Sequence, residues 1–168
     1  TEHPLLPLDL FKSRLFSGAI LITLLLYAGY YGILLMLPLN LIQIQGYSDI
    51  AAGCTLLPTM ILLVLCANWT GRYIDRHGPR RLLILGPIIA GIGFMLMALP
   101  GMTGGPRDFW YTYFPSLLVM GLGMALCIVP LSTTVMGSVP VHHSGLASGI
   151  NSAAARLASV MGIAVMGS

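Results

Sequence analysis

Two long stretches without a charged residue dominate this chain, and a short charged segment separates them. Residues 50–70 and 82–106 contain no Asp, Glu, Lys or Arg, whereas residues 71–81 contain one carboxylate and four arginines. A helix that crosses a bilayer needs about 20 mainly apolar residues. Each uncharged stretch is therefore long enough to cross a membrane, and the charged segment is expected to form a turn at the membrane surface.

The composition points to lipid as the solvent. The chain is 57% hydrophobic and 8% charged, with a mean hydropathy of +0.89. Soluble domains carry roughly 25% charged residues, because their surfaces face water. The net charge is +3, but the arginines lie at the ends of apolar segments and form no basic face for nucleic acid. A lipid bilayer is the expected partner, and nucleic acid is not.

The apolar pattern predicts an all-α integral membrane protein with five spans. The runs are too long for barrel strands and lack period-2 alternation. A lead-in of residues 1–14 precedes the spans, which cover about 15–42, 49–69, 82–99, 111–135 and 144–168. Ser48 is expected to cap the second span, with Asp49 in its first turn. The chain lacks an initial methionine and ends in an apolar run, so we expect a piece of a longer protein.

Positive charge predicts the orientation. Lys12 and Arg14 precede the first span, and the four arginines of residues 71–81 follow the second, so both groups lie on one side of the membrane. In the connections on the opposite side, Arg107 is the only Lys or Arg. Because short cytoplasmic loops are enriched in Lys and Arg, residues 71–81 are expected to face the cytoplasm of a multi-pass protein in the cell membrane.

The sequence gives little support for a metal site, a cofactor or an enzyme activity. The cysteines (Cys54, Cys66 and Cys127) lie at irregular spacing inside apolar runs and are interpreted as small packing residues. Adjacent His142 and His143 do not share a helix face, so a loop is favoured over a metal site or proton relay. We find no nucleophile–base set and no phosphate loop, and we predict no cofactor and no enzyme activity.

Residues 71–81 resemble the cytoplasmic signature of the major facilitator superfamily, Gly-x-x-x-Asp-Arg-x-Gly-Arg-Arg/Lys. Pro79 departs from this pattern, because it stands where an arginine usually follows the second glycine. The motif positions are filled by Gly71, Asp75, Arg76, Gly78, Arg80 and Arg81.

The remainder of the chain resembles the carboxy-terminal half of the 14-helix drug:proton antiporters. The similar segments are residues 3–14, 37–48, 52–58 and 145–162. The resemblance implies two six-helix halves that alternate access around a midplane site and export lipophilic, often cationic compounds in exchange for protons. This chain would supply the first five helices of the second half, and the amino-terminal half would be its partner.

The same resemblance implies a gating role for Asp75. In the family, the matching aspartate caps a helix of the opposite half and stabilises the outward-facing state. A contact made in only one state shifts the balance between states, whereas a contact equal in both does not. The alternative is that residues 71–81 only set the topology.

Several residues within the spans are candidates for the translocation pathway. Tyr27, Tyr30 and Tyr31 lie near the middle of the first span and either contact a cationic substrate through their ring faces or pack ordinarily. Asn151 either hydrogen-bonds between helices or lines the pathway. Arg156 either faces a cavity or partner or extends its side chain to the headgroups.

Small residues and interfacial aromatic residues complete the pattern. Gly145, Gly149 and Gly162 recur on a smooth face of the fifth span, which indicates either static helix packing or a sliding contact. Asn40, Gln43 and Gln45 lie near the external end of the first span. An aromatic belt at the interface is predicted from Trp69, Trp110, Tyr111 and Tyr113.

Every Asp and Glu lies at the end of a span or in a connection. If the protein exchanges protons, the carboxylate that carries them lies in the absent half. Two rival functions stay open, namely a uniporter or symporter of a polar nutrient within the same superfamily, and a polytopic structural or enzyme subunit. We expect the piece alone to transport nothing.

Overall fold

A computed structural model describes residues 13–99, 106–139 and 144–166. All regular structure in these ranges is helical. The long helices are α1 (Arg14–Gln43), α3 (Leu57–His77), α4 (Arg80–Met97), α5 (Tyr113–Gly137) and α6 (Ser144–Met166), and the short ones are α2 (Asp49–Cys54) and the 3-10 helix η2 (Pro106–Trp110). The expected fifth span therefore forms a helix of 23 residues.

Four regions of the described chain are long and apolar enough to cross a membrane: Arg14–Gln43, Asp49–His77, Arg80–Met97 and Asp108–Gly137. Large apolar side chains cover much of the outer surface, and examples are Val64, Leu65 and Met95, each at least two-thirds exposed. Acyl chains are the natural solvent for such a surface. Hydroxyl groups inside the helices bond to nearby backbone carbonyls, as Thr23 Oγ1 does to Ala19 O at 2.9 Å.

The second predicted span is wrong in one respect, because it consists of two helices. Ser48 caps α2 as expected, and its Oγ accepts a hydrogen bond from Ala51 N at 3.4 Å. The helix then stops at Cys54 and α3 begins at Leu57. Pro58 explains the break, since its ring has no N–H and would collide with the carbonyl four residues earlier. Proline is tolerated in the first turn of a new helix, and Pro58 lies there in α3.

The long turn predicted for residues 71–81 is also wrong. Helix α3 continues to His77 and α4 begins at Arg80, so only Gly78 and Pro79 connect them. Charged residues can continue a helix, and Arg76 and His77 in the last turn interact favourably with the helix dipole.

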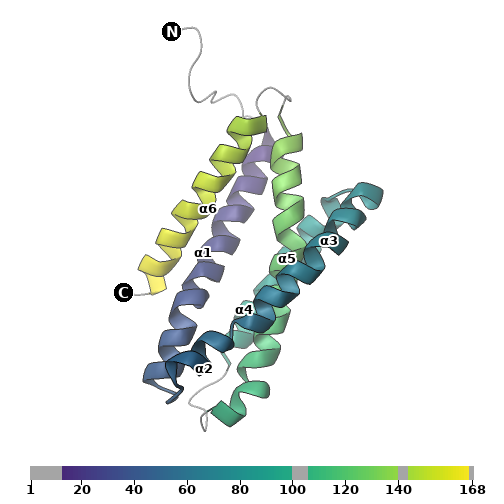
Figure 1. Cartoon of the computed structure of the whole chain (residues 1–168). Coiled ribbons are helices and arrows are strands. Elements are labelled where there is room, and N and C mark those ends of the chain that lie inside the picture. The colour runs from purple at the N-terminus through teal and green to yellow at the C-terminus, as the bar shows by residue number, and fades with distance from the viewer. Residues whose placement is uncertain (1–12, 100–105, 140–143, 167–168) are drawn as a thin grey trace.

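Helix α5 forms the centre of the bundle. It packs along α4 and α3 and also touches α1 and α6, and α6 packs along α1 (Figure 1). Its buried side chains include Leu117, Met120 and Met124, which are fully covered. At one end of the bundle lie the start of α1, the end of α5 and the start of α6, and at the other lie α2 and the start of α5 (Figure 1).

Small residues allow α4 and α5 to approach closely. A Cβ atom at Gly93 would overlap the backbone of Met120, and one at Gly123 would overlap the backbone of Ala90. Gly86 similarly faces the sulfur of Cys127. Close approach at small residues maximises dispersion contacts where no hydrophobic effect drives helices together.

Candidate functional site

The α3–α4 hairpin brings the motif residues together at one end of α3. Gly78 ends α3 with φ 76° and ψ 167°, a backbone conformation that is essentially restricted to glycine. Its N–H donates to Ile74 O at 2.8 Å, and Pro79 caps the start of α4. The departure at Pro79 therefore fits the fold locally, because proline favours the first positions of a helix.

Arg80 and Arg81 lie in the first turn of α4, and both are exposed. Positive charge at a helix N-terminus opposes the helix dipole, and no acidic residue lies in this turn to offset it. Arg80 and Arg81 therefore do not stabilise the start of α4 through the helix dipole. Their charge instead favours a position next to a negatively charged surface.

Gly71 and Asp75 lie four residues apart and share one face of α3. Asp75 is exposed, and within the described ranges its carboxylate forms no hydrogen bond or ion pair. Arg76 and Arg80, which lie near it in the sequence, form no ion pair with it. Its side chain is available to a group outside this part of the chain.

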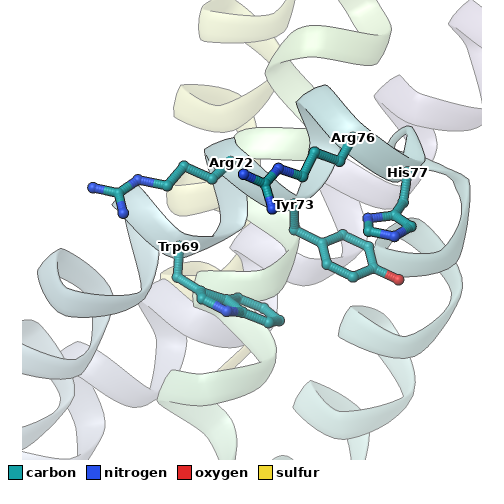
Figure 2. A pocket seen from close by; sticks show the side chains of 5 residues that line it. All are labelled: Trp69, Arg72, Tyr73, Arg76 and His77. Atoms are coloured by element: carbon teal, nitrogen blue, oxygen red, sulfur yellow. The ribbon is translucent and has the colours of Figure 1, made fainter.

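A pocket of about 250 Å³ also lies at the carboxy-terminal end of α3. Three rings form a row along the helix, with centroids 5.5 Å apart for Trp69 and Tyr73 and 4.7 Å apart for Tyr73 and His77. The side chains of Arg72 and Arg76 extend side by side in the same direction and complete the lining (Figure 2). Of these residues, sequence reasoning had assigned Arg76 to the motif and Trp69 to the aromatic belt, and it had missed the i, i+4 spacing of the rings.

The tyrosines of α1 form a compact group. Tyr31 lies 5.9 Å from both Tyr27 and Tyr30, measured between ring centroids. Tyr30 is buried in the core, Tyr27 is half-buried and Tyr31 is exposed. Among the three rings, that of Tyr31 is the most accessible to a molecule from outside this chain.

A polar cluster at the α2 end of the bundle escaped sequence reasoning. Gln45 is buried and its Nε2 donates to the hydroxyl of Tyr113 at 3.4 Å. Tyr113 is itself buried, so its place in an exposed aromatic belt was a wrong prediction, whereas Trp69, Trp110 and Tyr111 are exposed. Nearby, burial raises the pKa of the Tyr47 hydroxyl above its ordinary value.

Asn40 lies between two hollows at this end. Its Oδ1 is buried and has no hydrogen-bond partner among the described residues. One hollow, of about 200 Å³, is lined by Asn40, Tyr113 and apolar side chains that include Met36 and Met97. Gln43 lines the other hollow.

Residues of α6 occupy different environments. The Thr23 hydroxyl lies 3.1 Å from Asn151 Oδ1, which links α1 to α6. Arg156 is exposed on α6 and has no ion-pair partner among the residues that the structure describes. A Cβ at Gly162 would overlap the backbone of Ala28, whereas Gly145 and Gly149 face open space. Of these three glycines, Gly162 is the one at which an added Cβ would meet α1.

The structure brings no metal-ligand set together in the ranges it describes. Cys127 is buried, Cys66 is half-buried and Cys54 is exposed. His142, His143 and Lys12 lie outside the described residues, as do Glu2 and Asp9. The described carboxylates, Asp49, Asp75 and Asp108, all lie in the first or last turn of a helix, as the sequence indicated.

Comparison with known proteins gives a consistent result. The chain is 29% identical to the multidrug resistance protein Stp of Mycobacterium tuberculosis over 168 residues, which cover 100% of this chain and 30% of Stp. It is 29% identical to the multidrug export protein EmrB of Escherichia coli over 167 residues, covering 98% and 31%. It is 26% identical to the tetracenomycin C resistance and export protein of Streptomyces glaucescens over 172 residues, covering 98% and 30%. The chain therefore spans about 30% of the length of these relatives.

The family model described as Major Facilitator Superfamily matches residues 1–163, a range that includes the hairpin motif and nearly all of the helical bundle. This chain is a multi-pass membrane protein and belongs to the Major Facilitator Superfamily.

Proposed function

We propose that this chain is part of a secondary transporter that exports lipophilic compounds by alternating access. Similarity to drug- and antibiotic-export proteins over nearly the whole chain supports this proposal. In this proposal the chain has no enzyme activity. The protein lies in the cell membrane, with residues 71–81 in the cytoplasm and the α2 end of the bundle outside.

The observation that carries the mechanism is the exposed, unpaired carboxylate of Asp75 beside Gly71. A carboxylate at the end of a membrane helix gains most from a helix N-terminus or a cation, and no described residue offers one to Asp75. We propose that its partner lies in the other half of the complete protein. Because Gly71 has no side chain, a helix of that half can approach α3 closely enough to meet Asp75.

The Asp75 contact acts as a gate because it forms only while the cytoplasmic side is closed. Its loss shifts the population toward the other state by the free energy of the contact. Tyr27, Tyr30, Tyr31, Asn151 and Arg156 are proposed to lie along the pathway between the halves, and the exposed ring of Tyr31 is proposed to contact the substrate. Gly145 and Gly149, which face open space, are proposed to pack against the other half.

We also propose that export is driven by protons. The described spans hold no carboxylate away from a helix end, so the group that carries the proton belongs to the rest of the protein. A protonophore is expected to abolish export of a lipophilic cationic dye from cells that express the complete protein. Export that continues without a proton gradient would rule out antiport.

Replacing Asp75 with Asn in the complete protein tests the gate. Coupling energies of about 1–3 kcal/mol are typical of such contacts, so dye export is expected to fall at least about fivefold. Asp49→Asn is the matched control, because Asp49 is also exposed in a terminal helical turn but lies at the opposite end of the bundle. Equal export by both variants at equal expression would show that residues 71–81 set topology only.

A further inference from the structure

The pocket on α3 shares Arg76 with the motif, but its other lining residues are not part of the motif. Its lining combines two guanidinium groups with three stacked rings, all from one helix (Figure 2). Two arginines four residues apart form a binding site for an oxyanion, because guanidinium groups donate paired hydrogen bonds to phosphate. Within this pocket no carboxylate neutralises them.

The rings of the pocket lie on a different side of α3 from Asp75. At 100° per residue, the rings of Trp69, Tyr73 and His77 point about 120–160° away from Asp75 around the helix axis, and Arg72 and Arg76 point about 60° and 100° away. If the Asp75 face meets the other half of the transporter, as proposed above, the rings face the surrounding membrane and the two arginines lie between the rings and that half. This placement rests on the proposed function.

The row of rings continues as an apolar row toward the middle of the membrane. Leu65 and Ile61 precede Trp69 by four and eight residues and are 68% and 57% exposed. Each step of four residues spans about 6 Å along the axis and turns the row by about 40°, so Leu65 and Ile61 point about 80° and 40° away from Asp75. The row therefore changes from aliphatic to indole to phenol and imidazole beside two arginines, which matches the order of acyl chain, interface and headgroup in one bilayer leaflet.

We propose that this surface binds a single phospholipid with an anionic headgroup. The phosphate lies against Arg72 and Arg76, the glycerol region lies beside Trp69 and Tyr73, and an acyl chain follows Leu65 and Ile61. The site differs from a diffuse basic surface because it combines paired guanidinium groups with an adjoining apolar row. Arg80 and Arg81, on the next helix, contribute general attraction and do not line the pocket.

Native mass spectrometry of the complete protein in detergent tests this proposal. We expect it to retain phosphatidylglycerol in preference to phosphatidylcholine, which carries no net negative charge. A hydrogen bond to a charged group is worth at least about a factor of ten, so the double variant Arg72→Gln/Arg76→Gln is expected to bind phosphatidylglycerol about 100-fold more weakly. The matched control Arg80→Gln/Arg81→Gln removes the same charge but no proposed contact with the phosphate, so it is expected to lose only the smaller general attraction and to retain the preference.

Further arms separate a lipid from a free anion. Leu65→Asn is expected to weaken retention of phosphatidylglycerol, because it removes an acyl-chain contact. At a site for free phosphate the same substitution would leave binding unchanged. Equal loss in the two arginine double variants, or displacement of the lipid by inorganic phosphate, would overturn the lipid site. If the unsubstituted protein shows no preference for phosphatidylglycerol over phosphatidylcholine, another part of the transporter covers the pocket and the proposed lipid site is wrong.

The proposed function can be judged separately. Dye export and its response to Asp75→Asn are measured in cells and do not depend on lipid retention in detergent. If Asp75→Asn impairs export but phosphatidylglycerol is not preferred, the lipid site is wrong and the transporter proposal stands. If neither effect is seen, the lipid site and the Asp75 gate are both wrong, and dye export by the unsubstituted protein still tests the transporter proposal.

Discussion

At the scale of single residues, Gly78 shapes the motif hairpin. With φ 76° and ψ 167°, Gly78 adopts a backbone conformation that residues other than glycine rarely adopt. This geometry lets α3 end and α4 begin with only Gly78 and Pro79 between them. The motif glycine is therefore a structural requirement of the turn, whatever role its charged neighbours play.

Replacing Gly78 with Ala is expected to destabilise the protein by about 1–3 kcal/mol, because the backbone must either strain or rearrange. Asn, which tolerates the left-handed helical region, is expected to fail as a substitute, since that region lies near ψ +47° and not near 167°. Thermal unfolding in detergent measures both effects. Gly53→Ala is the control, because this helical glycine has an ordinary φ and open space around it, and an equal loss there would contradict the explanation.

Thr23 and Asn151 show how a polar pair is tolerated inside the bundle. The Thr23 hydroxyl has one proton and two acceptors within reach, Ala19 O at 2.9 Å and Asn151 Oδ1 at 3.1 Å. If the Thr23 hydroxyl donates its proton to Ala19 O, the side-chain amide of Asn151 must be rotated so that its N–H donates to the hydroxyl oxygen. Either arrangement joins α1 to α6 with a hydrogen bond that water cannot replace in lipid.

At the scale of elements, hydropathy alone predicts where the helices lie. Uncharged runs of this length have one stable form in lipid, so the spans near 15–42, 82–99 and 111–135 match α1, α4 and α5 within a few residues. The end of α3 was missed because charge was taken as a sign of a turn. The adjacent Gly78 and Pro79 were the better signal, since both residues end or restart helices.

Packing between helices was predictable only in part. The spacing of Gly86, Ala90 and Gly93 is visible in the sequence and indicates a close-packing face on α4. Its partner, the Met120 and Gly123 region of α5, is not visible, because one sequence contains no information on which faces meet. For the same reason the Asn40 hollow and the buried position of Tyr113 could not be predicted.

The α4–α5 contact makes a testable claim about this element pair. Gly123→Ala places a methyl group against the backbone of Ala90, which cannot move aside as a flexible side chain would. We expect a loss of about 1–3 kcal/mol in unfolding free energy, the usual cost of overpacking. Gly91→Ala is the matched control, because this α4 glycine has open space around it and alanine is the better helix former. Similar Tm values for the two variants would show that the helices separate easily at this contact.

At the scale of the whole molecule, the bundle has two chemically different ends. The start of α1 and the α3–α4 connection carry Arg14, Arg80 and Arg81, whereas the α2 end carries the buried Gln45–Tyr113 pair and exposed Trp110 and Tyr111. Four regions of the described chain are long and apolar enough to cross a membrane, and the long helices run between these two ends (Figure 1). The proposed gate, the proposed lipid site and the proposed direction of export all depend on the arginine end facing the cytoplasm.

Cysteine labelling in intact cells tests this orientation. Asp49 is exposed in the first turn of α2, at the predicted start of its span, so Asp49→Cys in a cysteine-free background is expected to react with a membrane-impermeant maleimide from outside. Arg80→Cys in a cysteine-free background is expected to react only after the membrane is permeabilised, because positive residues of short loops stay in the cytoplasm. The two variants control for each other, since each thiol is exposed and differs in its side of the membrane. The reverse pattern would place Asp75 outside the cell, where it cannot close a cytoplasmic gate, and would move the α3 pocket to the outer leaflet.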